Sequence, residues 1–294
     1  MKGTWTRWAS YGATAVALGF VLALAASLIL ESLPVWRHEG LSYLTGKIWH
    51  ARGERFGALP MIYGSASVAL IAVVLAAPLG LGAALFSAEY LPGRWRWWVK
   101  VPVELLAGVP SVVYGLLGVL LLRDWIYRLL TPLDPLSGDT LLTAGVLLAV
   151  MILPTVTTLA DDALRGVAAS QRRAARGLGL TRAEMIWRVS LPQAAPGLSA
   201  ALLLGLGRAL GETIAVFLVV GRRDNQWPAD LLSPRPWLEA GQTLTSKLGG
   251  SETFLAYGDP LHWGAVVGLG LVLLGLVSGL TLLAGRWLPR GRHA

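Results

Sequence analysis

The sequence contains no cysteine and only four histidines, and just 14% of its 294 residues are charged. Without cysteine the chain can form no disulfide framework, no thiolate metal site and no cysteine nucleophile. The histidines lack the close spacing of a metal site; they are His38, His50, His262 and His293. The nucleotide-binding pattern GxxxxGK[ST] is absent as well. We therefore expect no metal, no cofactor and no ATP hydrolysis by this chain.

Hydrophobic residues are abundant: they make up 54% of the chain, and the mean hydropathy is +0.59. Six stretches are long enough to cross a hydrocarbon layer of about 30 Å as helices; they lie at residues 10–30, 60–88, 100–122, 140–160, 196–221 and 262–285. We predict an all-α membrane protein with six transmembrane helices. The net charge of +8 is spread between these stretches rather than gathered in one basic domain, which argues against a nucleic-acid partner.

Basic residues predict the orientation. Segments on the side of both termini carry fourteen Lys and Arg in about 67 residues, and the opposite segments carry ten in about 87. Since basic residues accumulate in cytoplasmic loops, both termini are expected in the cytoplasm. We expect an N-terminal helix and outer loop at 1–55, a helical membrane domain at 56–286 and a short basic cytoplasmic tail at 287–294. The outer loops 31–59 and 222–261 are interpreted as capping or partner-facing segments.

The stretch GLGRALGET places two charges, Arg208 and Glu212, inside the fifth hydrophobic run. If that helix begins at Pro196, Arg208 lies about 18 Å along it, near the middle of the membrane. A central arginine costs on the order of 3 kcal/mol unless it faces a partner or a cavity. Arg208 and Glu212 are four residues apart, so they can share a helix face and neutralise each other as a structural lock. The alternative, which we favour, is a role in a substrate pathway, because intramembrane ionisable residues are usually functional.

A second informative stretch is QRRAARGLGLTRAEMIWRVSLPQAAPG at 171–197, within a cytoplasmic loop at 161–195. It predicts a short helix, a break at Gly177 and Gly179, a second helix from about Thr181 and a stop at Pro192. One side of the second helix is apolar and the other is charged. An apolar face on a loop indicates docking into a groove of a soluble partner; its residues are Met185, Ile186 and Val189.

The end of this loop resembles the EAA loop of ABC importer permeases. Gly179 is followed by nine residues and then by Val189, Ser190, Leu191 and Pro192, as in the family's Gly, nine residues, Ile, any residue, Leu-Pro. Ala174 and Ala175 occupy the two alanine positions, whereas Arg173 stands where the family usually has Glu. The resemblance implies that the loop couples the chain to an ATPase subunit. Arg173 reverses the charge at the position where the family usually has Glu, which bears on the charge pairing with that ATPase.

Further stretches resemble the phosphate ABC importer permeases, and the PstC type more than the PstA type. They are FGALPMIYGS (56–65), ELLAGVPSVVYGLLG (104–118), MILPTVTTLADDALRGV (151–167) and GLGRALGETIAV (205–216). The resemblance implies a type-1 ABC importer permease fold in a bacterial inner membrane, forming half of a phosphate pathway. It implies as partners a homologous second permease, two ATPase subunits, an extracytoplasmic phosphate-binding protein and membrane lipid.

An arginine offers a planar fork of donors that matches the oxygens of phosphate. We therefore expect Arg208 to meet the anion, Glu212 to orient Arg208, and hydroxyl groups to line the pathway; the candidates are Ser111, Tyr114 and Thr213. Three alternatives remain open from the residues: a permease for molybdate, sulfate or phosphonate, an ion-coupled secondary carrier, and a membrane scaffold that transports nothing.

Overall fold

The computed structural model describes residues 2–133, 136–228, 230, 233 and 235–287. Within this part of the chain, five helices are long and apolar enough to cross a membrane, and a bent helix pair raises the number to six. The main helices of these five are α1 (Lys2–Glu39), α3 (Leu59–Leu85), α7 (Leu141–Arg165), α10 (Leu191–Gly211) and α14 (Pro260–Trp287). The predicted all-α membrane fold is confirmed. Residues 288–294, most of the expected basic tail, lie outside the described residues.

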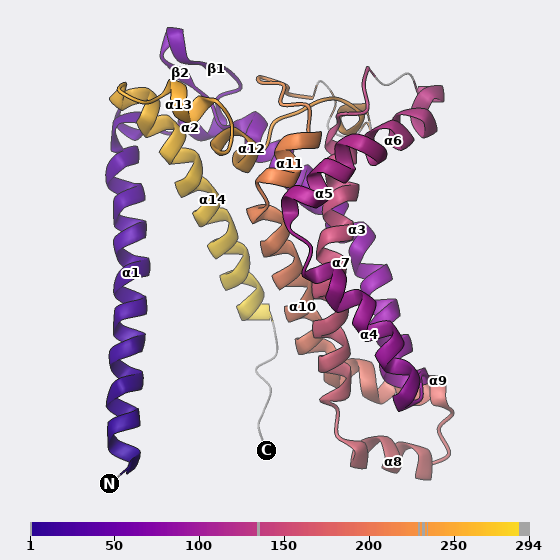
Figure 1. Cartoon of the computed structure of the whole chain (residues 1–294). Helices are drawn as coiled ribbons and strands as arrows, with labels where there is room; N and C mark the ends of the chain where they lie inside the picture. Colours follow the sequence, from indigo (N-terminus) through magenta and orange to yellow (C-terminus); the bar gives the residue numbers. More distant parts are fainter. Residues whose placement is uncertain (1, 134–135, 229, 231–232, 234, 288–294) are drawn as a thin grey trace.

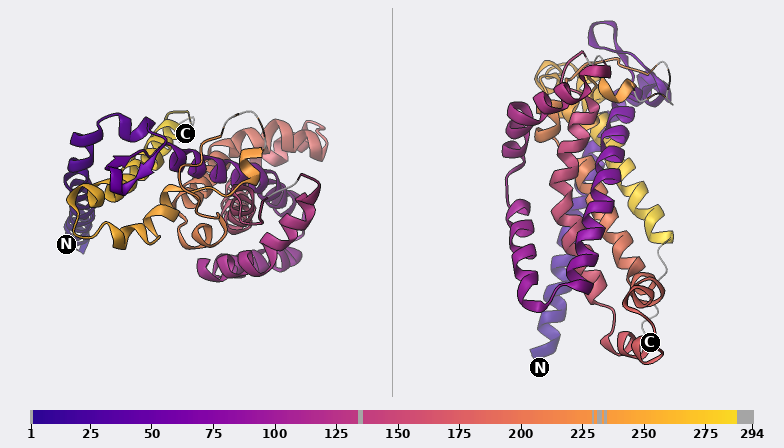
Figure 2. Two further views of the ribbon diagram at one scale, coloured as in Figure 1. Left: turned by 90° about the horizontal axis from the view of Figure 1, so that it is seen from above. Right: turned by 90° about the vertical axis from the view of Figure 1, so that its right-hand side faces the viewer.

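The helices form a bundle with two different ends. Helix α7 packs against α3 and α10, whereas α1 stands at the edge and contacts α14 (Figures 1 and 2). At one end, β1 (Trp49–His50) and β2 (Arg55–Phe56) form an antiparallel hairpin. At the opposite end lie α8 (Ala169–Gly177) and α9 (Arg182–Met185), and α1 begins on the same side. We refer to these as the hairpin end and the α8 end.

The hairpin end contains more structure than two loops. Three short helices lie there, α2 (Ser42–Thr45), α12 (Leu244–Leu248) and α13 (Glu252–Leu255). The prediction that the first transmembrane helix ends at residue 30 is wrong, since α1 continues to Glu39. The extension is stabilised by packing, because Ser32 and Val35 are fully buried there.

The third predicted span, 100–122, is not one straight helix. Helix α4 (Gly93–Ala107) and α5 (Ser111–Leu117) meet at a bend of 91°. Gly108 and Pro110 flank the bend, and proline disfavours a helical conformation in the residue before it. Beyond α5 the chain continues through a π-helical turn at Gly118–Leu122 into α6 (Arg123–Leu130).

The fifth predicted span, 196–221, is also broken. Helix α10 ends at Gly211, Glu212 is extended with φ −71° and ψ 123°, and α11 (Ile214–Val219) follows. The predicted helix stop at Pro192 is wrong as well. Pro192 is the second residue of α10, and Leu191 just before it donates its N–H to the Ile186 carbonyl across a π-helical turn, so the helix passes through the proline. The chain reaches it from α9 through a π-helical turn at Ile186–Ser190, so helical structure runs from Arg182 to Gly211.

The largest buried cluster joins the middle of α3, α5, α7, α10 and α11. Close approach is possible because a small residue lies at the contact between the two broken spans. A Cβ atom on Gly115 of α5 would lie 2.6 Å from Leu218 and 3.0 Å from the Cα of Ala215, both on α11. Helix α5 of the third span is therefore packed directly against α11 of the fifth span.

Candidate functional site

Arg208 lies in the last turn of α10, at the border of the large buried cluster. Its Nη1 donates a hydrogen bond of 2.8 Å to Oγ1 of Thr155 on α7. Thr155 directly follows Pro154, which lies inside the helix. The guanidinium is half-buried and is held from across the bundle, not from its own helix. It therefore points from α10 towards α7 at the level of the α10–α11 break.

Tyr114 connects the two helices on either side of the bend between α4 and α5. The side chain is buried in the same cluster as Ala209 and Leu210, the two residues after Arg208. Its hydroxyl donates a 2.8 Å hydrogen bond to the carbonyl of Leu106, so it ties α5 to the end of α4 across the bend. The bend of the third span and the break of the fifth are thus brought together around Arg208.

The four-residue spacing predicts that Glu212 shares a helix face with Arg208, and the structure does not place it there. Because α10 ends at Gly211, Arg208 and Glu212 do not continue one helix face, and among the described residues no ion pair joins them. The Glu212 carboxylate instead accepts a long hydrogen bond, 3.5 Å, from the backbone N–H of Ala215 in the first turn of α11. The mutual neutralisation of the structural-lock alternative is therefore absent among the described residues. No hydrogen bond or ion pair within that part of the chain lets Glu212 orient Arg208 as expected; Glu212 caps the helix that follows it.

The remaining predicted hydroxyl groups lie at the same two breaks. Ser111 is the first residue of α5 and is half-buried. Thr213 lies in the gap between α10 and α11, where its hydroxyl contacts the Gly211 carbonyl at 3.4 Å. In the described part of the chain neither hydroxyl bonds to Arg208. Thr155, which does, was not predicted as a site residue, although a hydroxyl immediately after an intrahelical proline is a signal that could have identified it.

The loop at the α8 end follows the predicted pattern up to its second helix. Gly179 has φ +81°, a conformation that favours glycine, and it separates α8 from α9. Thr181 caps α9: its hydroxyl accepts from the Glu184 N–H at 3.3 Å, and the Glu184 carboxylate accepts from the Thr181 N–H at 2.9 Å. The Thr181 N–H and hydroxyl both donate to the Glu184 carboxylate, and these two bonds lower the pKa of the exposed carboxyl. The predicted start of the second helix is confirmed.

The apolar face of that helix is not free for a partner. Met185 and Ile186 are buried against Ala175 of α8, and Val189 and Leu191 pack around them. The prediction that this face docks into a soluble protein is therefore wrong, because α8 folds back and covers it. The exposed surface of the loop consists of other residues; they include Arg173, Ala174, Gly179, Trp187 and Pro192.

A buried ion pair attaches this loop to the bundle. Arg172 of α8 lies 3.0 Å from the carboxylate of Glu89, whose side chain is only 3% exposed. Glu89 belongs to the π-helical turn Phe86–Tyr90 that follows α3. The same Arg172 nitrogen, Nη2, donates to the carbonyl of Leu164 near the end of α7. One side chain of the loop therefore contacts the ends of two transmembrane helices.

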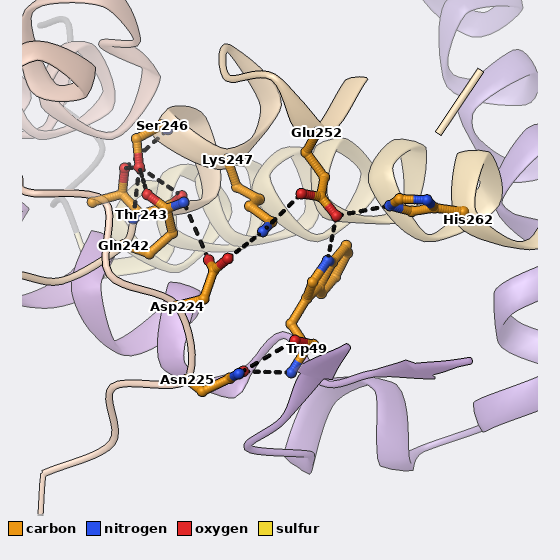
Figure 3. Close-up of polar contacts among 9 residues, drawn as sticks. All are labelled: Trp49, Asp224, Asn225, Gln242, Thr243, Ser246, Lys247, Glu252 and His262. Carbon is orange, nitrogen blue, oxygen red and sulfur yellow. Dashed lines mark hydrogen bonds and ion pairs between the residues drawn. The ribbon is translucent and has the colours of Figure 1, made fainter. Parts of the chain in front are cut away.

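The hairpin end contains a polar cluster that sequence patterns did not indicate (Figure 3). The ammonium of Lys247, a residue that is 3% exposed, lies 2.8 Å from Asp224 and 3.1 Å from Glu252. Glu252 also accepts from the indole N–H of Trp49 at 2.7 Å and contacts His262 at 2.7 Å. Burial raises the pKa of Glu252, but the Trp49 hydrogen bond, the Lys247 charge and the His262 contact outweigh it and lower the pKa below its ordinary value.

Comparisons with known proteins agree with this architecture. Residues 76–290 match the family described as binding-protein-dependent transport system inner membrane component. The chain is 34% identical to the phosphate transport system permease protein PstC of Mesorhizobium japonicum, over 90% of this chain and 83% of that protein. It is 33% identical to PstC 1 of Mycobacterium tuberculosis, over 89% and 85%. It is also 34% identical to the probable ABC transporter permease YqgH of Bacillus subtilis, over 95% and 89%.

Solved structures support the fold alone. An inward-facing MetNI methionine ABC transporter matches with a TM-score of 0.59 at 16% identity, covering 77% of this chain and 92% of that chain. A bacterial alginate ABC transporter in complex with an alginate-bound periplasmic protein matches with a TM-score of 0.57 at 15% identity, covering 97% and 94%. The predicted type-1 ABC importer permease fold is confirmed. The chain belongs to the family of binding-protein-dependent transport system inner membrane components, and within it to the PstC-type phosphate permeases.

Proposed function

We propose that this chain is the permease subunit of an ATP-driven inorganic phosphate importer and that Arg208 meets the anion in the membrane. The proposal rests on the unused N–H donors and the unpaired charge of the Arg208 guanidinium among the described residues. An arginine has five N–H donors and no acceptor, and here a single hydrogen bond, to a neutral hydroxyl, is formed. Its charge is left without a carboxylate partner among the described residues. A phosphate group supplies both the missing charge and acceptors for the free donors.

The two helix breaks support a pathway at this depth. Non-helical backbone inside a membrane is tolerated where it is buried in protein or lines a cavity that holds water. Arg208 precedes the Glu212–Thr213 gap by four residues, and Tyr114, which follows the Gly108–Pro110 bend, packs in the same buried cluster as Ala209 and Leu210. Ser111, Tyr114 and Thr213 remain proposed lining residues, and Glu212 is proposed to shape the gap by capping α11.

The arrangement of the two ends supports the proposed partners and orientation. We place the α8 end in the cytoplasm, in contact with one of two ATPase subunits, and the hairpin end outside, facing a phosphate-binding protein. The proposed ATPase contact consists of the exposed residues Arg173, Ala174 and Gly179. Ala175 is buried and packs on Met185, which holds this part of the loop in place. A second, PstA-like permease is proposed to complete the pathway, because one chain supplies only half of it.

Phosphate uptake by variants at Arg208 tests the proposal. Arg208→Leu, alone and with Glu212→Leu, is expected to insert and assemble but to abolish uptake of radiolabelled phosphate. Arg208→Lys keeps the charge but loses the planar fork, and we expect severe impairment. Arg128→Leu, an exposed arginine on α6, is the matched control and is expected to transport normally. Uptake near the wild-type rate in the assembled double variant would disprove the pathway role.

A further inference from the structure

The hydroxyl of Thr155 is bonded differently from most hydroxyls whose bonds are described in the long helices of this chain. Six Ser or Thr hydroxyls donate to the carbonyl four residues earlier; they are Thr14, Thr45, Thr131, Thr157, Ser199 and Thr281. This bond satisfies the hydroxyl donor of a helical Ser or Thr where no water is available. In Thr155 the oxygen instead accepts a hydrogen bond from Arg208, on another helix.

This arrangement leaves the Thr155 proton unused. A hydroxyl carries one donor and two acceptor lone pairs, and Nη1 of Arg208 occupies one lone pair. Among the described residues, no acceptor takes the Thr155 O–H. The unused proton therefore lies next to the unused N–H groups of Arg208, and both are donors. Two neighbouring donors with no acceptor nearby are suited to an oxyanion, which has several acceptor oxygens and no carbon substituent to block them.

We propose that Thr155 is a second ligand of the transported anion, its hydroxyl donating to one oxygen while Arg208 binds another. This inference rests on the proposed role of Arg208 and extends it to α7. The anion completes the hydrogen bonds of both side chains, and the Arg208–Thr155 bond fixes the spacing of the two donors. Because the two residues are on α7 and α10, a bound anion links these two helices.

Isosteric substitution separates the hydroxyl from the shape of the side chain. Thr155→Val removes the hydroxyl at nearly constant volume, and uptake of radiolabelled phosphate is expected to fall about tenfold to a hundredfold, the effect of losing a hydrogen bond to a charged group. Thr155→Ser keeps the hydroxyl and is expected to restore most of the rate. Thr157→Val is the matched control, since that hydroxyl bonds to its own helix, and it is expected to stay near wild type.

Contact with the anion can be tested independently of uptake because the chain contains no cysteine. Thr155→Cys introduces a single thiol, and its labelling by a small, water-soluble thiol reagent in membranes is expected to be slowed by inorganic phosphate. Thr157→Cys is expected to show no phosphate protection. Labelling of Thr155→Cys that phosphate leaves unchanged, or wild-type uptake by Thr155→Val, would overturn the inference. Normal uptake by Arg208→Leu would instead overturn the proposed function.

Discussion

The ion pair between Arg172 and Glu89 predicts an asymmetric loss of stability. In Arg172→Met, Glu89 keeps its charge in a site where its side chain is 3% exposed, and nothing replaces the nitrogen at 3.0 Å. Breaking a buried pair in this way costs about 3–5 kcal/mol. Glu89→Gln leaves the charge on Arg172, which is 19% exposed and still donates to Leu164, so the cost should be smaller, about 1.5–3 kcal/mol, that of one hydrogen bond to a charged group.

The double variant provides the decisive comparison. With both charges removed no unpaired carboxylate stays buried, so Glu89→Gln with Arg172→Met should be more stable than Arg172→Met alone. The measurement is the thermal unfolding of the purified chain in detergent, with Arg176→Met, an exposed arginine on the same helix, as the control. We expect the control to change the free energy of unfolding by less than about 0.5 kcal/mol. Equal losses in the two single variants, or additive losses in the double variant, would refute the reasoning.

Three further predictions concern the loop and the hairpin end. Gly179→Ala should destabilise the chain by about 1 kcal/mol, measured by thermal unfolding, because φ is +81° while no atom lies within 4 Å of the added Cβ. Arg173→Glu should reduce copurification of the ATPase without affecting folding, since Arg173 is exposed; an unchanged complex would show the position to be neutral. The stabilisation that Glu252 provides should be complete above its ordinary pKa and lost as the pH falls through its lowered pKa, and Glu252→Gln should remove this dependence from unfolding curves measured against pH.

Local sequence information was sufficient for the number of spans and for part of the loop. The length of a hydrophobic run determines whether it can cross a membrane, and this property does not depend on neighbouring segments. The start of α9 was equally local, because Thr181 and Glu184 satisfy each other's backbone N–H groups within four residues. The same reasoning failed at Pro192, because the π-helical turn Ile186–Ser190 leads the helix through the proline and into α10.

The breaks and the polar cluster depend on tertiary contacts. Arg208 and Glu212 have helical spacing and apolar neighbours, so a continuous helix was the simplest interpretation. The helix ends at Gly211 in a region where Gly115 allows α5 to approach α11 closely. Likewise, Glu252 receives its hydrogen bond from Trp49, 203 residues away in the chain, and Lys247 pairs with Asp224, 23 residues away, only once the chain has folded. No periodic pattern within one segment carries that information.

Arg208 is connected differently to the two ends of the molecule. A helix break separates it from the hairpin end, whereas continuous helix joins it to the α8 end. The break in the fifth span follows Arg208 towards the hairpin end, whereas α10 is helical from Arg208 back to Leu191. Helix α7 is likewise helical from Thr155 to Leu164, where Arg172 of α8 contacts it. The loop at the α8 end thus joins the two helices that carry the partners of the 2.8 Å bond between Arg208 and Thr155. The 2.8 Å bond is thus a direct side-chain link between the two helices that the loop connects, on the side of the breaks where both helices are continuous down to the loop.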